Sequence, residues 1–534
     1  MTPVGQLQYF RSRIDGILHP YAVCSTDTSD EPKPLIVEVS PGALGNLPGA
    51  VELTEQIAGI ASKHNQSCVV LRPTGRGSGS VYQNYGEIDV LEAIEHVASN
   101  YAIDRDRITI TGSSMGGAAT WYLISHYPDL FAGAAPFCGY CDYRLWEKPG
   151  GLTFHMHEWE TPSWCARSAA FLIENLAHTP AWIIHGEWDR GVGGGVPVEH
   201  SRQMAQLMEE RGYTHKYTEV PKTGHGCRLP DIWAEVILWL LKQRKQRSPN
   251  HVSLATYNLR HNQSYWVTVD QLTHYGERGT INAQFVTNNC LTVHTENIRT
   301  FSLGPIHKNE QANVTIDGQK FELINLSHQK QFQRNHKGVW GHSNFDLSAE
   351  KRHRASGPIS DLFFDGLILV PGTVGTEEET FFNKWIAENA IGYYSSRNGG
   401  VHRGGIMGDN AVQLPVIPDV ELTEDLLQMN NLLLYGVYDS NAILSQFEGK
   451  LPFTFEGKTI HLSDKSYTAD GAAIFAIFPH PSNSERYVAV HAGVTPDAIC
   501  WGSHLDMQLL PDYIVYSRGQ LLDWGFWGND WKSQ

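Results

Sequence analysis

This sequence has few cationic side chains and no long apolar runs, and each of these absences excludes a class of partner. The 41 lysines and arginines are outnumbered by 57 aspartates and glutamates, which leaves a net charge of −16. Because a surface that binds a phosphate backbone must be basic, we expect no nucleic-acid partner. No apolar run reaches the length of a membrane span, so we also expect no membrane partner.

Cysteine is scarce too, with eight in 534 residues, which is too few for a disulfide scaffold. Cys138 and Cys141 have Cys-x-x-Cys spacing, but no thioredoxin-like start precedes them. A structural pair or free thiols near a pocket wall are therefore favoured over a redox site. No second Cys/His pair has matching spacing, so we expect neither a metal nor a cofactor.

Two further absences concern processing and architecture. The first residues lack the charged-then-apolar pattern of a signal peptide, so we expect a cytoplasmic protein, or a secreted one if Met1 replaces a removed signal. No repeat of about 40–50 residues is present, which argues against a β-propeller. At 534 residues the chain is too long for one ordinary core, so two or three domains are expected.

The most informative segment that is present spans residues 108–117. A β-branched run ends in Gly-Ser-Ser-Met-Gly, and a helical pattern follows. A tight strand-to-helix turn of the form Gly-x-Ser-x-Gly exposes its central serine, here Ser114, as a nucleophile. Gly112 and Gly116 remove the side chains that would collide in such a turn. A helix N-cap would also explain the serine, but it needs no glycine on both sides.

An acid and a base follow downstream. Residues 181–186 read as a buried strand, and Asp189 comes just after its carboxyl end, where open α/β sheets place functional side chains. Asp189 is the predicted acid. Glu187 is the second candidate because it is nearby, but its side chain would point to the opposite side of the sheet if the strand continues. His225 lies in a Gly-flanked loop after a second strand and is the predicted base.

Other titratable residues have plainer explanations. His185 could compete as the base, yet it ends a hydrophobic strand and is better placed in the core. His200 and His215 look like surface residues. Glu87 and Asp89 open a helix and suit its positive end, so a structural role is favoured for both.

These motifs resemble the α/β-hydrolase superfamily, and within it the esterase and prolyl-oligopeptidase-like serine hydrolases. The resemblance covers about residues 8–246. It rests on the Gly-x-Ser-x-Gly turn around Ser114 (the elbow), on Tyr-Pro-Asp-Leu-Phe-Ala after the helix that follows it, and on His-Gly-x-x-Asp before Val-Pro. It implies Ser114 as nucleophile, Asp189 as acid and His225 as base. One departure is the glycine-rich stretch 191–195, which leaves the conformation of the acid loop open.

The predicted oxyanion hole also departs from the family pattern. Where relatives carry His-Gly-Gly, residues 40–43 read Ser-Pro-Gly-Ala. The chemistry needs two backbone N–H donors, and Met115 supplies one because it follows the nucleophile. Gly42 or Ala43 would supply the other, because Pro41 has no N–H.

The predicted fold is an α/β-hydrolase domain with a mostly parallel, doubly wound sheet, then a β-sandwich-like section and a C-terminal α/β section. Strands and helices alternate over residues 1–248, which is typical of a parallel sheet covered on both faces. Short alternating runs separated by turns indicate a β-sandwich over residues 249–350. The α/β alternation returns in residues 351–534. These C-terminal sections resemble, more loosely, those that follow hydrolase domains in some bacterial prolyl-oligopeptidase-like proteins.

Three further segments have two interpretations each. The stretch between Cys138 and His178, which is rich in Trp, Tyr, His and Pro and includes residues 154–159, is either an inserted pocket wall or an ordinary packed connection. Residues 439–441 (Asp-Ser-Asn) follow a strand, and a helix N-cap explains them better than a second active site. The aromatic residues 524–531 could stack on sugar rings or a partner, but core or interdomain packing is favoured.

Together these features predict a serine hydrolase that cleaves a carboxylic ester through an acyl-enzyme intermediate. The expected partner is a small-molecule ester or a short peptide, because the triad alone does not distinguish an ester from an amide. A serine peptidase of prolyl-oligopeptidase-like type is therefore the alternative. A non-catalytic binding protein that uses its C-terminal domains is the second alternative, and the complete triad argues against it. Homo-oligomerisation is left open.

Overall fold

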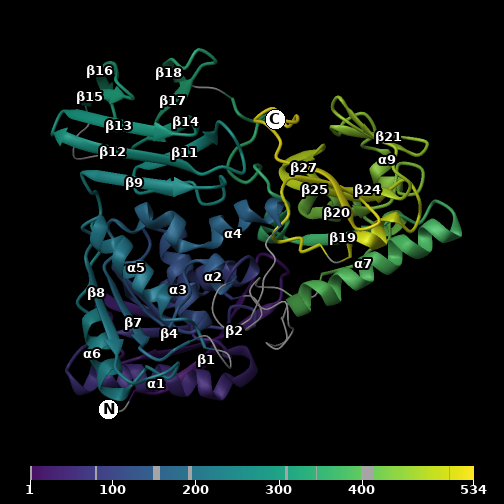
Figure 1. The fold of residues 1–534 in the computed structure, drawn as a ribbon. Coiled ribbons are helices and arrows are strands. Elements are labelled where there is room, and N and C mark those ends of the chain that lie inside the picture. The colour runs from purple at the N-terminus through teal and green to yellow at the C-terminus, as the bar shows by residue number, and fades with distance from the viewer. Residues whose placement is uncertain are drawn as a thin grey trace.

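The computed structural model describes residues 3–77, 81–147, 157–190, 195–306, 311–343, 346–397, 414–503 and 505–534. Three parts, each built on its own sheets, follow one another along the chain. In Figure 1 the first part lies at the lower left, the second above it and the third to the right. The C-terminus lies near the junction of the second and third parts.

The first part contains an eight-stranded sheet of order β1-β2-β4-β3-β5-β6-β7-β8. β1 and β2 pair in antiparallel fashion, as do β2 and β4, whereas the neighbours from β4 to β8 are parallel. The predicted mostly parallel sheet is confirmed. The strands are β1 Gly5–Arg11, β2 Leu18–Ser25, β3 Lys33–Glu38, β4 Val69–Pro73, β5 Ile103–Ser113, β6 Gly133–Phe137, β7 Ala181–Gly186 and β8 His215–Val220.

Helices cover both faces of this sheet, as the alternating pattern predicted. On β3, Ile36 packs into a buried cluster with α1 and α6, whereas Leu35 and Val37 pack into a second cluster with α2, α3 and α5. Successive strand residues point to opposite faces, so this split shows that both faces are buried. The helices are α1 Leu47–Lys63, α2 Tyr85–Asn100, α3 Met115–His126, α4 Thr161–Arg167, α5 Glu199–Glu210 and α6 Pro230–Leu240.

The second part is the predicted β-sandwich. Its two five-stranded sheets have the orders β10-β11-β14-β17-β18 and β16-β15-β13-β12-β9. Along β12, Ile281, Ala283 and Phe285 point into the shared core while the residues between them face outward. The strands are β9 His251–Thr256, β10 Gln263–Ser264, β11 Val267–Leu272, β12 Gly279–Thr287, β13 Cys290–Glu296, β14 Ile298–Leu303, β15 Gln311–Ile316, β16 Gln319–Asn325, β17 Lys330–Arg334 and β18 Trp340–Ser343.

The third part has a six-stranded sheet of order β19-β20-β25-β24-β26-β27 and a small sheet β21-β22-β23. In this sheet β19, β20 and β25 pair in parallel, whereas β25, β24, β26 and β27 pair in antiparallel fashion, so the predicted α/β section is a mixed sheet. Its elements are β19 Leu367–Pro371, α7 Glu377–Arg397, α8 Glu424–Met429, β20 Asn431–Tyr435, α9 Ala442–Ser445, β21 Phe453–Glu456, β22 Thr459–Leu462, β23 Lys465–Tyr467, β24 Ala472–His480, β25 Asn483–Gly493, β26 Tyr513–Ser517 and β27 Gln520–Gly525.

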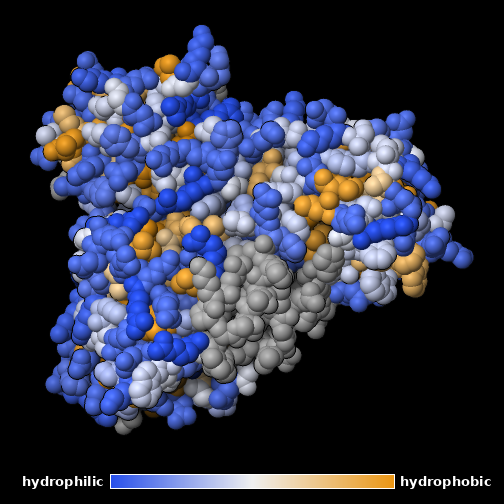
Figure 2. Space-filling view, viewed as in Figure 1, coloured by the Kyte–Doolittle hydropathy of each residue, from blue (hydrophilic) through white to orange (hydrophobic). Residues whose placement is uncertain are grey.

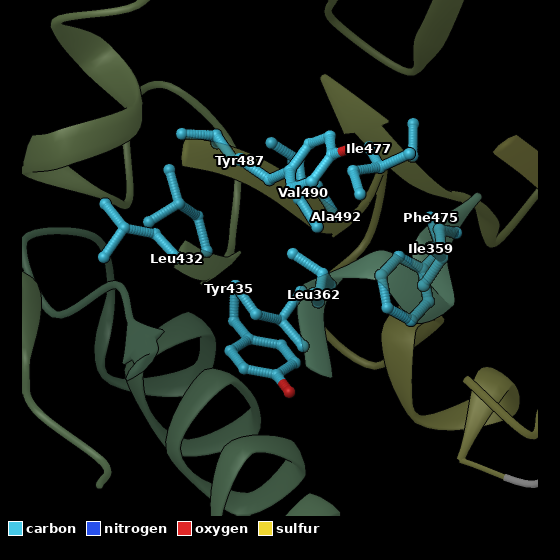
Figure 3. Close-up of a cluster of buried hydrophobic side chains, with 14 of the residues drawn as sticks. Ile359, Leu362, Leu432, Tyr435, Phe475, Ile477, Tyr487, Val490 and Ala492 are labelled. Atoms are coloured by element: carbon cyan, nitrogen blue, oxygen red, sulfur yellow. The ribbon is translucent and has the colours of Figure 1, made fainter. Parts of the chain in front are cut away.

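The core of the third part gathers side chains from distant segments. Figure 3 shows Leu432 and Tyr435 of β20 beside Val490 of β25, with Leu362 from an upstream 3-10 helix turned toward them. The same buried cluster takes in Tyr85 of α2, so it extends into the first part. The first and third parts therefore share apolar packing.

Polar contacts also join the parts. Glu87 of α2 is fully buried, and its Oε1 lies 2.7 Å from Nε2 of His261 in the second part. Tyr122 and Tyr127 donate to the same carboxylate. The structural role predicted for Glu87 is confirmed, with the addition of a partner from another part of the chain.

The aromatic C-terminal segment packs between the second and third parts. Trp527 is fully buried and donates its indole N–H to the carbonyl of Ile477 at 2.8 Å. Nζ of Lys351 lies 4.0 Å from the ring centre of Tyr275 and 4.9 Å from that of Trp531. The packing interpretation of residues 524–531 is therefore confirmed.

The surface agrees with the acidic, polar composition. Figure 2 shows a face covered mostly by hydrophilic residues, with smaller apolar areas between them. In the described part of the chain, no helix is both long and apolar enough to cross a bilayer.

We keep 1–248, 249–350 and 351–534 as the proposed domain division.

Candidate active site

Ser114 lies at the turn between β5 and α3. β5 ends at Ser113 and α3 begins at Met115. The backbone of Ser114 has φ 60° and ψ −118°, a conformation that non-glycine residues rarely adopt. Its N–H donates to the carbonyl of Phe137 at 2.8 Å, while its side chain makes no capping hydrogen bond to α3. This geometry matches the predicted elbow and does not match a helix N-cap.

The two glycines of the elbow are required by close backbone contacts. A Cβ atom on Gly112 would lie 2.5 Å from the carbonyl oxygen of Gly116. A Cβ atom on Gly116 would lie 2.4 Å from the carbonyl oxygen of Val39. Any side chain at either position would therefore push the strand and the helix apart.

Asp189 and His225 contact each other. Asp189 follows β7 and is almost fully buried, and His225 lies in the loop after β8 with a third of its side chain exposed. Nδ1 of His225 lies 2.6 Å from Oδ2 of Asp189. Glu187, the second candidate acid, instead accepts a hydrogen bond from the N–H of Lys222 at 2.8 Å. The structure therefore brings Asp189, and not Glu187, to the imidazole.

His185 makes a second contact with the acid. Its Nε2 lies 3.3 Å from Oδ2 of Asp189 and 2.9 Å from the carbonyl oxygen of Val196, and its Nδ1 lies 2.7 Å from Oγ of Ser201. The side chain is fully buried, which confirms the predicted core position. Sequence reasoning missed that this core histidine helps to orient Asp189.

The prediction that His200 is a surface residue is wrong. His200 is fully buried on α5, where Met204 and Met208 share its inward face. Burial lowers the pKa of His200 to about 3, so the imidazole is neutral. The spacing of four residues between these three side chains was the available signal, because such spacing puts them on one helical face. His215 is half-buried at the start of β8.

The electrostatics of the acid–base pair follow from these contacts. Burial alone would raise the pKa of Asp189, but hydrogen bonds from His185 and His225 outweigh it and hold the pKa far below its usual value. The hydrogen bond to Asp189, and then the contact with Cys138, raise the pKa of His225 above its usual value. An ionised Asp189 therefore favours the proton on Nδ1, which is the tautomer that the predicted roles require.

The segment predicted to complete the oxyanion hole is tied to the elbow. The N–H of Ser113 donates to Oγ of Ser40 at 3.0 Å, and the hydroxyl of Tyr82 donates to the carbonyl of Ser40 at 2.8 Å. Gly42 follows with φ 84°, and Ala43 is buried at the start of a short 3-10 turn. The N–H donors predicted from Met115 and from Gly42 or Ala43 thus come from two segments that contact each other.

A compact apolar cluster adjoins the elbow. It contains Met115 and Ala118 of α3, together with aromatic and aliphatic side chains from several connections. The remaining members are Val81, Tyr140, Tyr143, Trp164, Val196 and Leu509. Leu509 comes from the third part of the chain, so the surroundings of Ser114 are not built by the first part alone.

The neighbour of Leu509 anchors this contact. Asn84 donates to Oε1 of Gln508 at 2.6 Å, and Arg167 donates to the carbonyl oxygen of Gln508 at 2.8 Å. Gln508 is almost fully buried. Sequence reasoning missed this segment, because nothing in its own sequence signals a contact more than 300 residues away along the chain.

Part of the predicted pocket wall lies outside the described residues. This applies to 148–156, which include half of the segment 154–159, and to 191–194 in the acid loop. Of the segment's described residues, Trp159 packs against the core of the third part.

Among the described residues, one group of His, Cys, Asp and Glu side chains could hold a metal ion. It consists of Cys138, Asp189 and His225, whose ligand atoms lie within 4.8 Å of one another. Two of the three are the predicted acid and the predicted base. Residues 439–441, for which the sequence allows a second active site or a helix N-cap, directly precede α9. Asn441 accepts hydrogen bonds from the N–H groups of Ile443 and Leu444, so the predicted N-cap is confirmed.

The comparisons with known proteins concern the first part of the chain. Residues 65–243 match the sequence profile of the prolyl oligopeptidase family. This segment, which contains the elbow, Asp189 and His225, is an α/β-hydrolase domain of that family, as the motifs predicted.

Individual relatives cover small parts of their own length. An uncharacterised secreted protein of Arthroderma benhamiae is 30% identical over 251 residues, which is 41% of this chain and 25% of that protein. The acylamino-acid-releasing enzyme of Arabidopsis thaliana is 27% identical over 175 residues, which is 29% of this chain and 22% of that enzyme. The chain thus spans about a quarter of these curated relatives. A solved structure of a thermostable esterase has 25% identity and a TM-score of 0.36, covering 45% of this chain and 63% of that one.

Proposed function

We propose that this protein is a serine hydrolase that cleaves a carboxylic ester, with Ser114 as nucleophile, His225 as base and Asp189 as acid. The observation that carries the proposal is the 2.6 Å contact between the buried carboxylate of Asp189 and the imidazole of His225, in a domain whose elbow holds Ser114 in a strained turn. A serine with only a structural role would not need that conformation.

The proposed reaction has two halves. Oγ of Ser114 attacks the carbonyl carbon while Nε2 of His225 takes its proton, and the N–H groups of Met115 and of Gly42 or Ala43 bind the oxyanion. His225 then protonates the leaving alcohol, which leaves an acyl group on Ser114. Water, deprotonated by His225, attacks this acyl group and releases the acid. Asp189 stabilises the imidazolium in both halves.

An ester with an apolar acyl group fits the surroundings best. Buried aromatic and aliphatic side chains lie beside the elbow, and we propose that they favour a hydrocarbon acyl chain. A peptidase is the second candidate, and the match to the prolyl oligopeptidase family favours it. Against it, the described residues after the first part form a sandwich and a mixed sheet and no propeller blades.

The test is a matched panel of substrates. The same acyl groups, from acetyl to octanoyl, are offered to the full-length protein as p-nitrophenyl esters and as p-nitroanilides. We expect kcat/KM for the ester to exceed that for the anilide and to increase from acetyl to longer acyl groups. Faster cleavage of N-acyl amino-acid anilides than of every ester would favour the peptidase.

A further inference from the structure

Cys138 and Cys227 lie against each other beneath the candidate active site. Their Sγ atoms are 2.8 Å apart although 89 residues separate them in the sequence, and both residues are buried. The Cys-x-x-Cys spacing pointed to Cys141 as the neighbour of Cys138. Sγ of Cys141 instead contacts the carbonyl oxygen of His200 at 3.2 Å.

The pair connects the two sides of the site. Cys138 directly follows β6, and the preceding Phe137 accepts the hydrogen bond from the N–H of Ser114. Cys227 lies two residues after His225 in the loop that carries the base. Sγ of Cys138 also lies 3.4 Å from the carbonyl oxygen of His225. A covalent bond between the two sulfurs would therefore tie the loop of His225 to the strand beside the nucleophile.

We infer that Cys138 and Cys227 are an oxidative modification site, a reversible disulfide that fixes the loop of His225 to β6. With hydrogen peroxide as oxidant, one thiol gives a sulfenic acid and water, and the second thiol displaces a further water to form the S–S bond. Two electrons pass from the two sulfurs to the peroxide. A dithiol reductant reverses the reaction by thiol–disulfide exchange.

The surroundings of the two cysteines indicate a disulfide that forms slowly and stabilises the loop, and not a fast redox sensor. Cys138 and Cys227 are each about 1% exposed, so an oxidant rarely reaches either sulfur and oxidation is slow. The same burial then shields the bond from reductants. The disulfide would close a long loop, which restricts the unfolded chain strongly.

The first experiment maps the bond in the full-length protein. The protein is treated with hydrogen peroxide, its remaining thiols are alkylated in denaturant, and its peptides are analysed by mass spectrometry. We expect a linked peptide pair containing Cys138 and Cys227, with a mass two hydrogens below the sum of the two peptides, and its loss after dithiothreitol. If Cys138 and Cys227 are still found as alkylated thiols after exhaustive peroxide treatment, or are linked only to other cysteines, the inference is overturned.

The second experiment measures the disulfide's effect on the loop. Amide hydrogen exchange of residues 221–229 is compared between oxidised and reduced protein, and heat inactivation is followed in parallel. We expect oxidation to slow exchange in this loop and to lengthen the half-life at elevated temperature severalfold. Cys227→Ser should abolish both effects, whereas Cys141→Ser, an equally buried cysteine outside the pair, should keep them.

This inference rests on the proposed function only for the importance of the loop. Peptide mapping and hydrogen exchange need no catalytic activity, so the disulfide can fail while the hydrolase stands, and the reverse. Equal exchange of residues 221–229 in the two redox states would contradict the stabilisation of the loop even if the bond forms.

Discussion

Nδ1 of His225 lies 2.6 Å from Oδ2 of Asp189, across 36 residues of sequence. The contact raises the pKa of His225 above the usual value of about 6.5. The imidazole must be neutral to accept the proton of Ser114, so a raised pKa moves the onset of activity to higher pH. We expect kcat/KM to increase with pH with a midpoint above 6.5. A midpoint at or below 6.5 would contradict the electrostatic role of Asp189.

Asp189→Asn tests the same contact from the other side. Loss of the carboxylate removes the charge that holds the imidazole in its working tautomer, and we expect kcat/KM to fall about 10⁴-fold. The residual activity should have its midpoint at lower pH than the wild type. Glu187→Gln is the matched control, and it should cost far less because Glu187 contacts the backbone of Lys222. The reverse ranking would move the acid to Glu187.

The buried Glu87 makes the junction of the first two parts sensitive to acid. Burial would raise its pKa, but the nearby His261 outweighs it and lowers the pKa of Glu87 from 4.5 to about 2. A depressed carboxylate pKa stabilises the fold above about pH 4.5, and this stabilisation is lost as the pH falls toward 2. We expect Glu87→Gln to lower the free energy of unfolding at pH 7 by roughly 3 kcal/mol. In urea titrations at several pH values, the variant should also lose less of its free energy of unfolding between pH 4.5 and pH 2 than the wild type does.

Glu95→Gln is the control for that measurement. Glu95 lies on the same helix and pairs with Arg105, but more than half of its side chain is exposed. Exposed ion pairs contribute little, so we expect a change below about 1 kcal/mol. Equal effects of the two substitutions would show that Glu87 has no special role at the junction.

Leu509 should influence acyl-chain preference although it belongs to the third part. Its side chain is fully buried in the apolar cluster beside the elbow. Leu509→Ala enlarges that space, and we expect the ratio of kcat/KM for octanoyl over butanoyl esters to change about tenfold. Leu510→Ala, whose side chain packs in the core of the third part, should lower stability without changing the ratio. An unchanged ratio in Leu509→Ala would remove the third part from the substrate pocket.

A fragment of residues 1–248 should be poorly soluble. It would expose Tyr85 and Ile88, which pack in the core of the third part, and it would leave Glu87 without His261. Size-exclusion chromatography against the full chain checks this expectation. A soluble, monomeric fragment with full activity would show that the C-terminal half is an independent module, and it would revive a binding role for that half.

The elbow and the acid–base pair could be predicted because their signals are local. The strand, the glycines and Ser114 lie within ten residues, and Asp189 and His225 each follow a recognisable strand. The segment match to the prolyl oligopeptidase family confirmed the fold of that half. The β-sandwich was predictable from its alternation alone. The third part was predicted as α/β, but the antiparallel pairing of β24 to β27 that makes its sheet mixed was not predicted.

What the sequence did not reveal depends on contacts between distant segments. His261 reaches Glu87, Gln508 reaches Asn84 and Cys227 reaches Cys138 across 174, 424 and 89 residues. Local periodicity carries no information about such pairs, because tertiary packing alone brings them together. The burial of His200 is a different case, since its helical face could have been recognised.

Covalent labelling at Ser114 tests the central claim most directly. The full-length protein and its Ser114→Ala variant, both checked for folding by circular dichroism, are incubated with a fluorophosphonate probe and assayed on the best ester. The account predicts labelling of the wild type on the peptide containing Ser114, no labelling of the variant, and a loss of turnover on the order of 10⁵- to 10⁶-fold. Normal hydrolysis or equal labelling by a folded Ser114→Ala protein would contradict it.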